Sequence, residues 1–391
     1  MILSTVCYLN FEHIIQSGLN EEPVLLAQAV EQYAKLSAAS RYMGAILPKE
    51  TFDLAKLMAA SRRFRQTKIL GFVNEVDEEK HIQFCAMTYL LPSGTVFVAY
   101  RGTDDNIIGW KEDFMLAFTS PVPAQTRAVE YLEAVAEAFP DAPIRVGGHS
   151  KGGNLAFYAA ACAKSEVQNR ILAAYSNDGP GFMPEFFEKP GYLAVEKRLH
   201  SYIPQSSIVG GLLHTPKHFC VIHSTNKTIL QHDPFSWTVV GPHFRHERTR
   251  SAFGVRADIT FERWLEKLTL KERESFIQKT FGLLSDSGAK TLSDIVTSKL
   301  KSIRTIVTSF TRLDKADREM MFRIVHELLR ASHESRELTK VQEEFADLLL
   351  PEPKPAAAKA KPPKATKEAQ KKPKPTQSAK KEKAPTGQGK G

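Results

Sequence analysis

The sequence predicts an α/β protein with a mainly parallel sheet, followed by a helical region and a disordered tail. Three observations lead to this fold class. Apolar strand-like segments alternate with amphipathic helical segments from about residue 69 to residue 222. After residue 250 only helical periodicity remains, and the last stretch is mostly Lys, Pro and Ala without aromatic residues. We therefore expect three parts, with bounds 1–250, 251–350 and 351–391.

The N-terminal segment has apolar residues spaced three and four apart, which is the period of an amphipathic helix. The next segments are rich in apolar and β-branched residues, and 95–100 is apolar throughout, as a buried strand should be. We expect helices at 22–36 and 51–64 with a turn at 39–47, then strands at 69–76, 82–91 and 95–100.

Helices and strands alternate beyond residue 100, which is typical of a parallel sheet covered on both faces. We expect helices at 125–139 and 154–164, and strands at 144–146, 171–175, 199–203 and 219–222. The region after residue 250 shows no strand pattern, and we expect helices at 260–284, 291–313 and 314–350.

The positive charge of the chain is confined to its C-terminal tail. Residues 351–391 hold 12 Lys and 3 Glu, which accounts for the whole net charge of +9, so the first 350 residues are neutral. A generally nucleic-acid-binding core is therefore not indicated. The tail is either a solvated segment or a means of attachment to an acidic surface, such as nucleic acid, anionic lipid or an acidic protein.

The pentapeptide Gly148-His149-Ser150-Lys151-Gly152 has the G-x-S-x-G pattern of a nucleophile elbow. The bare pattern occurs by chance in about one chain in eight of this length. Here an apolar strand precedes it and a helix of small residues follows it, which is the context that the motif requires. We therefore predict that Ser150 is a nucleophile, and a glycine-rich structural turn is the alternative.

A serine nucleophile needs a histidine base and an acid that orients the histidine. We choose His232, in a polar turn after the last expected strand, and keep His223 in reserve. For the acid we choose Asp178, which directly follows the strand at 171–175 in a loop of Gly and Pro. The alternatives are a turn-capping histidine and an Asp that serves only as a turn residue before Gly. Asp233 is a weaker acid candidate, because it is adjacent to His232.

The oxyanion of such a reaction is held by backbone N–H groups. One comes from the residue after the nucleophile, which is Lys151, and the other from the loop after the third strand. That loop contains Gly102 and Thr103, and Thr103 adds a hydroxyl to the expected site. The sequence contains no H-E-x-x-H, C-x-x-C or P-loop pattern, so no metal or cofactor is predicted.

Two segments resemble the class 3 lipase family of α/β-hydrolases. One is V-A-Y-R-G-T, which ends at Thr103, and the other is G-H-S-K-G-G-N, which starts at Gly148. Within that family the chain looks most like an uncharacterised bacterial branch that also carries N-D-G-P-G-F, P-Q-S-S-x-V-G and Q-H-D-P-F-S-W, found here from Asn177, Pro204 and Gln231. The resemblance covers residues 1–250 and implies an α/β-hydrolase with Thr103 in its oxyanion hole.

The chain departs from that family at the expected acid. Class 3 lipases carry it in D-x-V-P, whereas the matching place here has Ser207. The acid is then Asp178, or Asp233, or it is missing.

We therefore expect a serine hydrolase that cleaves carboxylic esters, with lipid or other acyl esters as substrates. The alternative is an inactive hydrolase-fold protein that binds a partner through its helical region and basic tail. No signal peptide or membrane-spanning run is evident, so the expected location is cytoplasmic.

Overall fold

The computed structural model describes residues 1–37, 48, 50–291, 294 and 299–349. By its internal contacts the chain divides into a unit of Met1–Glu343 and a unit of Glu344–Gly391, and the fold below is that of the first. The turn expected at 39–47 and the tail at 351–391 lie outside the described residues. The expected domain boundaries at 250 and 350 therefore remain predictions.

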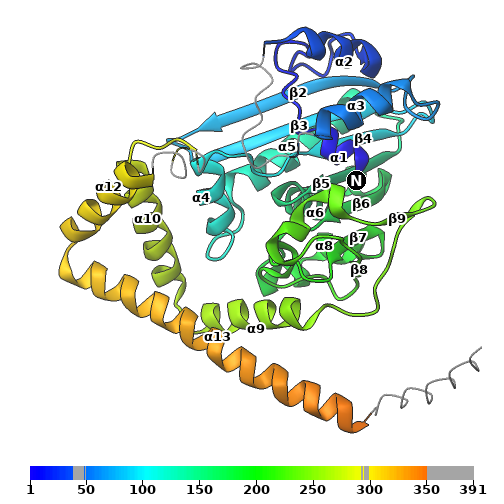
Figure 1. The fold of residues 1–391 in the computed structure, drawn as a ribbon. Helices are drawn as coiled ribbons and strands as arrows, with labels where there is room; N and C mark the ends of the chain where they lie inside the picture. The colour runs from blue at the N-terminus through cyan, green and yellow to red at the C-terminus, as the bar shows by residue number, and fades with distance from the viewer. Residues whose placement is uncertain (38–47, 49, 292–293, 295–298, 350–391) are drawn as a thin grey trace, which may run out of the picture. The chain divides into compact units, whose positions relative to one another are not determined.

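An eight-stranded sheet forms the centre of the first unit, and its strands follow one another in chain order (Figure 1). The first four strands pair antiparallel, and the last five are parallel to one another. The α/β class with its parallel section is therefore confirmed. The strands are β1 (Val24–Leu25), β2 (Lys68–Asp77), β3 (Ile82–Leu90), β4 (Val96–Tyr100), β5 (Ile144–His149), β6 (Ile171–Asn177), β7 (Leu199–Pro204) and β8 (Cys220–Ile222).

Helices cover both faces of this sheet, and the strand order explains which face each helix covers. Parallel strands in chain order with right-handed crossovers leave all crossover helices on one face. On that face α5 (Pro123–Ala138), α6 (Lys151–Cys162) and α8 (Pro190–Val195) pack in one core with Phe84 and Ala86 of β3. The alternate residues Cys85 and Met87 point to the opposite face. That face is covered by α1 (Ile2–Val6), α2 (Leu26–Lys35) and α3 (Glu50–Ala60).

Several short elements around the sheet were not predicted. The most important is α4 (Ile107–Met115), which begins where the Asn106 side chain accepts a hydrogen bond from Ile108 N. A hairpin of β9 (Val239–Val240) and β10 (His243–Phe244) follows β8. The others are α7 (Ser165–Arg170) and the 3₁₀ turns η3 (Val209–Gly211), η4 (Thr228–His232) and η5 (Pro234–Ser236). The turns η1 (Pro184–Glu188) and η2 (Glu196–Arg198) lie with α8 at 182–198, where the sequence predicts loop and helix.

The described chain after Ser251 consists of α9 (Ala252–Glu266), α10 (Leu270–Asp286), α12 (Lys299–Arg312) and α13 (Lys315–Leu349). The prediction of one continuous helix at 260–284 was wrong, because Thr269 starts a new helix with Glu272 in a reciprocal capping box.

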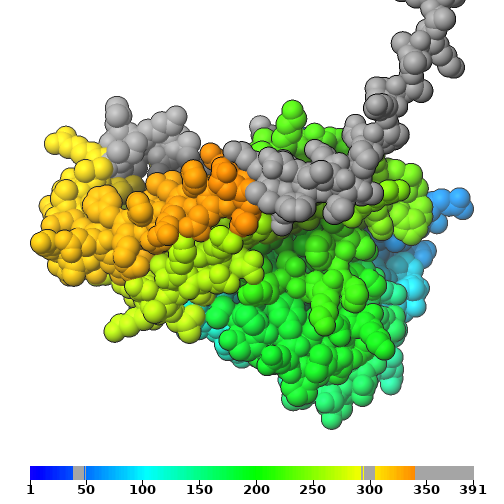
Figure 2. Space-filling view, turned by 90° about the horizontal axis from the view of Figure 1, so that it is seen from below, coloured from blue at the N-terminus to red at the C-terminus, as the bar shows by residue number. Residues whose placement is uncertain are grey.

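These helices contact both the sheet domain and one another. Phe281 of α10 packs on Phe114 of α4, with ring centroids 5.7 Å apart. In Figure 2 the orange α13 lies against the yellow-green α9, and a 2.7 Å hydrogen bond joins Ser335 and Thr260 between them.

The turn between β5 and α6 requires glycine at two positions. A Cβ on Gly148 would lie 2.0 Å from the carbonyl carbon of Gly152. A Cβ on Gly152 would lie 2.2 Å from the carbonyl oxygen of Tyr100. Both contacts are with backbone atoms, so no side chain can move to relieve them. The two glycines therefore allow the helix to start directly against the sheet.

We expect Gly152→Ala to lower the free energy of unfolding by about 1–3 kcal/mol, because the methyl group overpacks the turn. Gly282 is the matched control, since it lies in α10 and a Cβ there would meet no atom within 4 Å. Gly282→Ala should raise stability by up to about 1 kcal/mol through helix propensity. Urea unfolding followed by circular dichroism measures both, and equal stability of the two variants would contradict this account of the turn.

Candidate active site

Ser150 lies on the sharp turn between β5 and α6 and is half-buried. Its backbone has φ +57° and ψ −135°, a region that residues other than glycine rarely adopt. Two hydrogen bonds hold the turn against β6: Ser150 N donates to Asn177 O at 3.1 Å, and Asn177 Nδ2 donates to Gly148 O at 2.8 Å. This strained strand–turn–helix on a parallel sheet is the arrangement of an α/β-hydrolase elbow.

His232 and Asp178 are brought together at the same edge of the sheet. His232 Nδ1 lies 2.7 Å from Asp178 Oδ2. Asp178 follows the end of β6, and His232 ends η4, a turn beyond β8. The ring of His232 lies 4.5 Å from the ring of His149, the neighbour of Ser150. A direct hydrogen bond between Ser150 and His232 is not among those that the described residues form.

Asp178 is fully buried, and its backbone has a positive φ of 55°. Besides His232, its carboxylate accepts hydrogen bonds from Ser207 Oγ at 2.8 Å and from Gly210 N at 3.1 Å. Ser207 occupies the position where the class 3 lipase pattern has its acid. In this chain that position therefore supplies a donor to the carboxylate rather than the carboxylate itself.

The two reserve candidates have other partners. His223 Nδ1 lies 2.8 Å from Thr238 Oγ1. Asp233 caps the start of η5, where its Oδ1 accepts from Phe235 N at 3.0 Å. The contacts of the described residues thus pair His232 with Asp178, and the two reserve candidates take no part in this pair.

Thr103 lies in the loop after β4, and it is buried. Its hydroxyl donates a 2.6 Å hydrogen bond to Asp113 Oδ2 on α4. The single hydroxyl proton is therefore committed to a carboxylate. The neighbouring Gly102 is needed for close approach, because a Cβ there would lie 2.8 Å from Ser150 Cβ.

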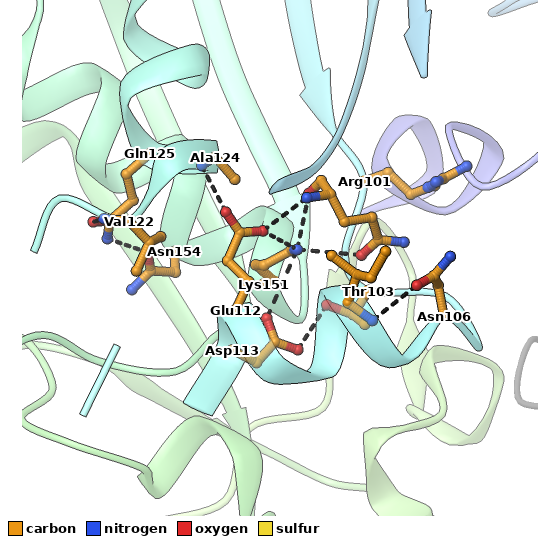
Figure 3. Close-up of polar contacts among 12 residues, drawn as sticks. Arg101, Thr103, Asn106, Glu112, Asp113, Val122, Ala124, Gln125, Lys151 and Asn154 are labelled. Carbon is orange, nitrogen blue, oxygen red and sulfur yellow. Dashed lines mark hydrogen bonds and ion pairs between the residues drawn. The ribbon is translucent and has the colours of Figure 1, made fainter. Parts of the chain in front are cut away.

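The side chain of Lys151 is a buried cation directly behind the elbow (Figure 3). Its ammonium donates to Gln83 O at 2.9 Å, Gln83 Oε1 at 3.2 Å and Glu112 Oε2 at 2.9 Å. An ammonium has three protons, and these three acceptors use them all. Lys151 and Glu112 are 1% and 0% exposed, so they form an ion pair away from water.

Glu112 is itself fully hydrogen-bonded. Its Oε1 accepts from Ala124 N at 2.7 Å, and its Oε2 accepts from Gln83 N at 3.1 Å as well as from Lys151. The ion pair thus connects the elbow, strand β3, helix α4 and the start of α5.

Asp113 lies beside this pair, with its Oδ1 3.9 Å from Lys151 Nζ. Burial raises the pKa of Asp113 to about 6, against the opposing effect of Lys151 and of the Thr103 hydrogen bond. A carboxyl group that titrates close to neutral pH therefore lies next to the loop from which the oxyanion donor was predicted.

Sequence reasoning missed the side chains behind the site. Glu112 and Gln83 lie 39 and 68 residues from Lys151 along the chain, so no local spacing connects them. His149 was seen only as a variable position of the elbow. The one available signal was Lys151 itself, the only charged residue of the buried helix α6.

The family model named Mbeg1-like matches residues 58–282. The chain belongs to the Mbeg1-like family. The matched range includes Ser150, Asp178 and His232. The finer resemblance to a bacterial branch, with its four motifs, remains a prediction. None of the curated proteins compared matches this Mbeg1-like chain.

Among solved structures, this Mbeg1-like protein is similar to a Rhizomucor miehei lipase in complex with its propeptide, at 18% identity over 42% of this chain and 67% of that one, with a TM-score of 0.33. It is also similar to a mutant form of MDLA from Penicillium cyclopium, at 11% identity over 63% and 82%, with a TM-score of 0.37. A lipase from Yarrowia lipolytica matches at 14% identity over 44% and 69%, with a TM-score of 0.29.

Within the described residues, no group of three or more His, Cys, Asp or Glu side chains is arranged to hold a metal ion. In the same part of the chain, no helix is long and apolar enough to cross a membrane. The expected lack of a cofactor and the expected cytoplasmic location remain predictions from the sequence.

We expect Lys151→Met to lower the free energy of unfolding by about 3–5 kcal/mol, because it leaves the Glu112 carboxylate buried without its cation. Adding Glu112→Gln should restore part of the loss, since Gln removes the charge and keeps an oxygen acceptor. Lys164→Met is the matched control, because Lys164 is exposed where it pairs with Glu133 and should matter little. Urea unfolding measures all three, and equal losses at Lys151 and Lys164 would refute the structural role of the buried pair.

The raised pKa of Asp113 makes the stability of the protein depend on pH. The Asp113 carboxyl loses its proton near pH 4 in the unfolded chain and near pH 6 in the folded protein. Between pH 4 and pH 6 the folded state therefore binds one proton more than the unfolded state. The stabilisation is complete below about pH 4 and is lost as pH rises through 6. As pH rises from about 4 to 6.5, we expect the free energy of unfolding of the wild type to fall by about 2–3 kcal/mol relative to that of Asp113→Asn. A difference between the two proteins that stays constant over this pH range would contradict the raised pKa.

Proposed function

We propose that this Mbeg1-like protein is a serine hydrolase that cleaves carboxylic esters with Ser150, His232 and Asp178. The observation that carries the proposal is the 2.7 Å contact of His232 Nδ1 with the buried Asp178 carboxylate, at the sheet edge where the elbow presents Ser150. A strained serine and an oriented histidine at one edge are the parts that nucleophilic acyl transfer requires.

In the proposed reaction Ser150 Oγ attacks the ester carbonyl, and His232 takes the hydroxyl proton. Because Nδ1 of His232 is occupied by Asp178, the accepting atom is Nε2. His232 then returns the proton to the leaving alcohol, and an acyl-enzyme remains on Ser150. Water activated by His232 releases the acid and restores the serine. The Asp178 carboxylate stabilises the imidazolium that forms.

The oxyanion in this proposal is held by the backbone N–H groups of Lys151 and Thr103. The Thr103 hydroxyl already donates to Asp113, so we assign the role to the main chain of Thr103 and not to its side chain. The Lys151–Glu112 pair holds the first of these donors in place by anchoring the start of α6.

Three aromatic side chains, Phe114, Phe118 and Trp237, are candidates for lining an acyl pocket. Trp237 is 4% exposed and donates to Gln231 O, and Phe118 packs in the cluster of Ile107 and Phe281. Phe114 remains 48% exposed on α4, where its ring also packs on Phe281 of α10. We propose acyl or lipid esters as substrates, with this exposed ring on the helix that follows the loop of Thr103 as the apolar contact.

The alternative of an inactive binding module was motivated by Ser207 at the usual position of the acid. The contact of His232 with Asp178 supports the hydrolase over that alternative. Attachment through the basic tail at 351–391 remains a separate proposal, and those residues lie outside the described structure.

A fluorophosphonate probe should label the full-length protein at Ser150, and Ser150→Ala should abolish labelling. Asp178→Asn should slow labelling by about 10³- to 10⁴-fold, because His232 would lose its orientation and its counter-charge. Mass spectrometry of the modified peptide and the rate of labelling measure both effects.

Ser93→Ala is the matched control, since Ser93 is exposed in the turn between β3 and β4 and should leave labelling unchanged. Folded wild-type protein that is not labelled at Ser150 would overturn the proposed function.

A further inference from the structure

His149 lies between the nucleophile and the base and contacts both segments. It ends β5, next to Ser150, and its side chain is 6% exposed. Its Nε2 lies 2.9 Å from the main-chain oxygen of His232, and the two imidazole rings are 4.5 Å apart at an interplanar angle of 30°. Trp237 packs on the same ring at 5.9 Å.

The contact with a carbonyl determines the protonation of His149. A carbonyl oxygen only accepts, so Nε2 of His149 carries the proton and donates it to His232 O. Nδ1 then has a free lone pair, and the hydroxyl of Tyr8 lies 3.1 Å from it in a position to donate. Burial lowers the pKa of His149 well below its ordinary value, and the electrostatic effect of His232 adds a smaller decrease. His149 is therefore a neutral imidazole with one defined tautomer.

Tyr8 comes from the segment just after α1 and is buried to 5% exposure. Its hydroxyl also donates toward the main-chain oxygen of His149 at 3.3 Å, so its single proton is shared between that oxygen and Nδ1. A Cβ on Gly102 would lie 2.2 Å from this hydroxyl, so Tyr8 fills the space against the oxyanion loop. One tyrosine hydroxyl thus touches the elbow residue and borders the loop after β4.

The turn that carries His232 is short and largely open to solvent. It is a single 3₁₀ turn in which Ile229 and Leu230, just before His232, are 57% and 65% exposed. Asp178 holds one edge of the imidazole, and the buried Gln231 before it is held by Trp237 Nε1 and Ser206 N. The His149 ring N–H adds a fixed point on the main chain of His232 itself.

We propose that Tyr8 and His149 form a positioning pair that keeps the base within reach of Ser150. The His149 ring N–H holds the carbonyl of His232, and the Tyr8 hydroxyl beside Nδ1 of His149 favours the tautomer that makes this hydrogen bond. The inference rests on the proposed hydrolase function. Neither residue touches the reacting atoms, and both act through His232.

The test compares two replacements of His149 in the full chain. His149→Gln keeps a side-chain N–H near the position of Nε2, and His149→Phe keeps a ring against His232 but has no donor. We expect His149→Phe to slow the labelling step at saturating fluorophosphonate by on the order of 100-fold, with the half-saturating probe concentration unchanged. His149→Gln should recover most of that rate. Tyr8→Phe should lower the rate in the same direction.

His200→Phe is the matched control, because His200 also packs on an aromatic ring, that of Tyr175, near the opposite end of its strand. It should leave the rate unchanged. Wild-type labelling rates in His149→Phe, or equal losses in His149→Phe and His149→Gln, would overturn the positioning role.

A second readout separates this proposal from the proposed function. The His232 Nδ1 proton, bonded to Asp178, should give a downfield NMR signal in the wild type and in His149→Gln, and a signal broadened by solvent exchange in His149→Phe and Tyr8→Phe. This holds whether or not the protein reacts with the probe. Identical signals in all four proteins would overturn the positioning pair, whereas absent labelling of the wild type overturns only the hydrolase.

Discussion

The buried ion pair of Lys151 and Glu112 is the interaction on which the rest of the site depends. Burying two charges is costly, and the cost is recovered only where geometry is good and the remaining hydrogen-bonding capacity is satisfied. Here the ammonium uses all three protons and the carboxylate accepts from two backbone N–H groups. Because these partners come from β3, α4 and α5, the pair couples the start of α6 to the loop that carries Thr103. A turn with a strained serine needs such support from its surroundings, since its own backbone conformation is unfavourable.

Under the proposed function the acid is Asp178, at the end of a different strand from the place where the class 3 lipase pattern has its acid. Asp178 reaches His232 from the end of β6, and Ser207, beyond β7, donates to the same carboxylate. Parallel strands end at one edge of the sheet, so side chains from neighbouring strand ends can reach the same place. A buried carboxylate there must be hydrogen-bonded. Ser207 meets that need, and its hydroxyl oxygen in turn accepts a 3.2 Å hydrogen bond from Gly210 N.

The parts of the fold that local chemistry determines could be predicted from the sequence, and the parts that depend on distant contacts could not. The strand, glycine-flanked serine and small-residue helix at Ser150 are a local pattern, and so is the alternation of strands and helices. Asp178 and His232 could be chosen because each follows a strand. The break at Thr269 was also readable, as a T-x-x-E capping box, but helical periodicity on both sides concealed it. The partners of Lys151 could not be predicted, since they are set by how β3 and α4 pack beneath the elbow.

Tyr8 belongs to the part of the chain that precedes the family match at 58–282, and it contacts the site through His149. A hydrolase elbow needs strand β5 and helix α6, yet the face of the sheet opposite α6 is covered by α1, α2 and α3. That cover brings a tyrosine hydroxyl beneath His149, where a neutral imidazole needs a donor for its Nδ1. A water molecule could supply the same hydrogen bond, but water would also admit the alternative tautomer and raise the local dielectric. A buried phenol supplies the donor while keeping the surroundings apolar, so the N-terminal layer does more than complete the core: it sets the electrostatic conditions in which one histidine can hold another.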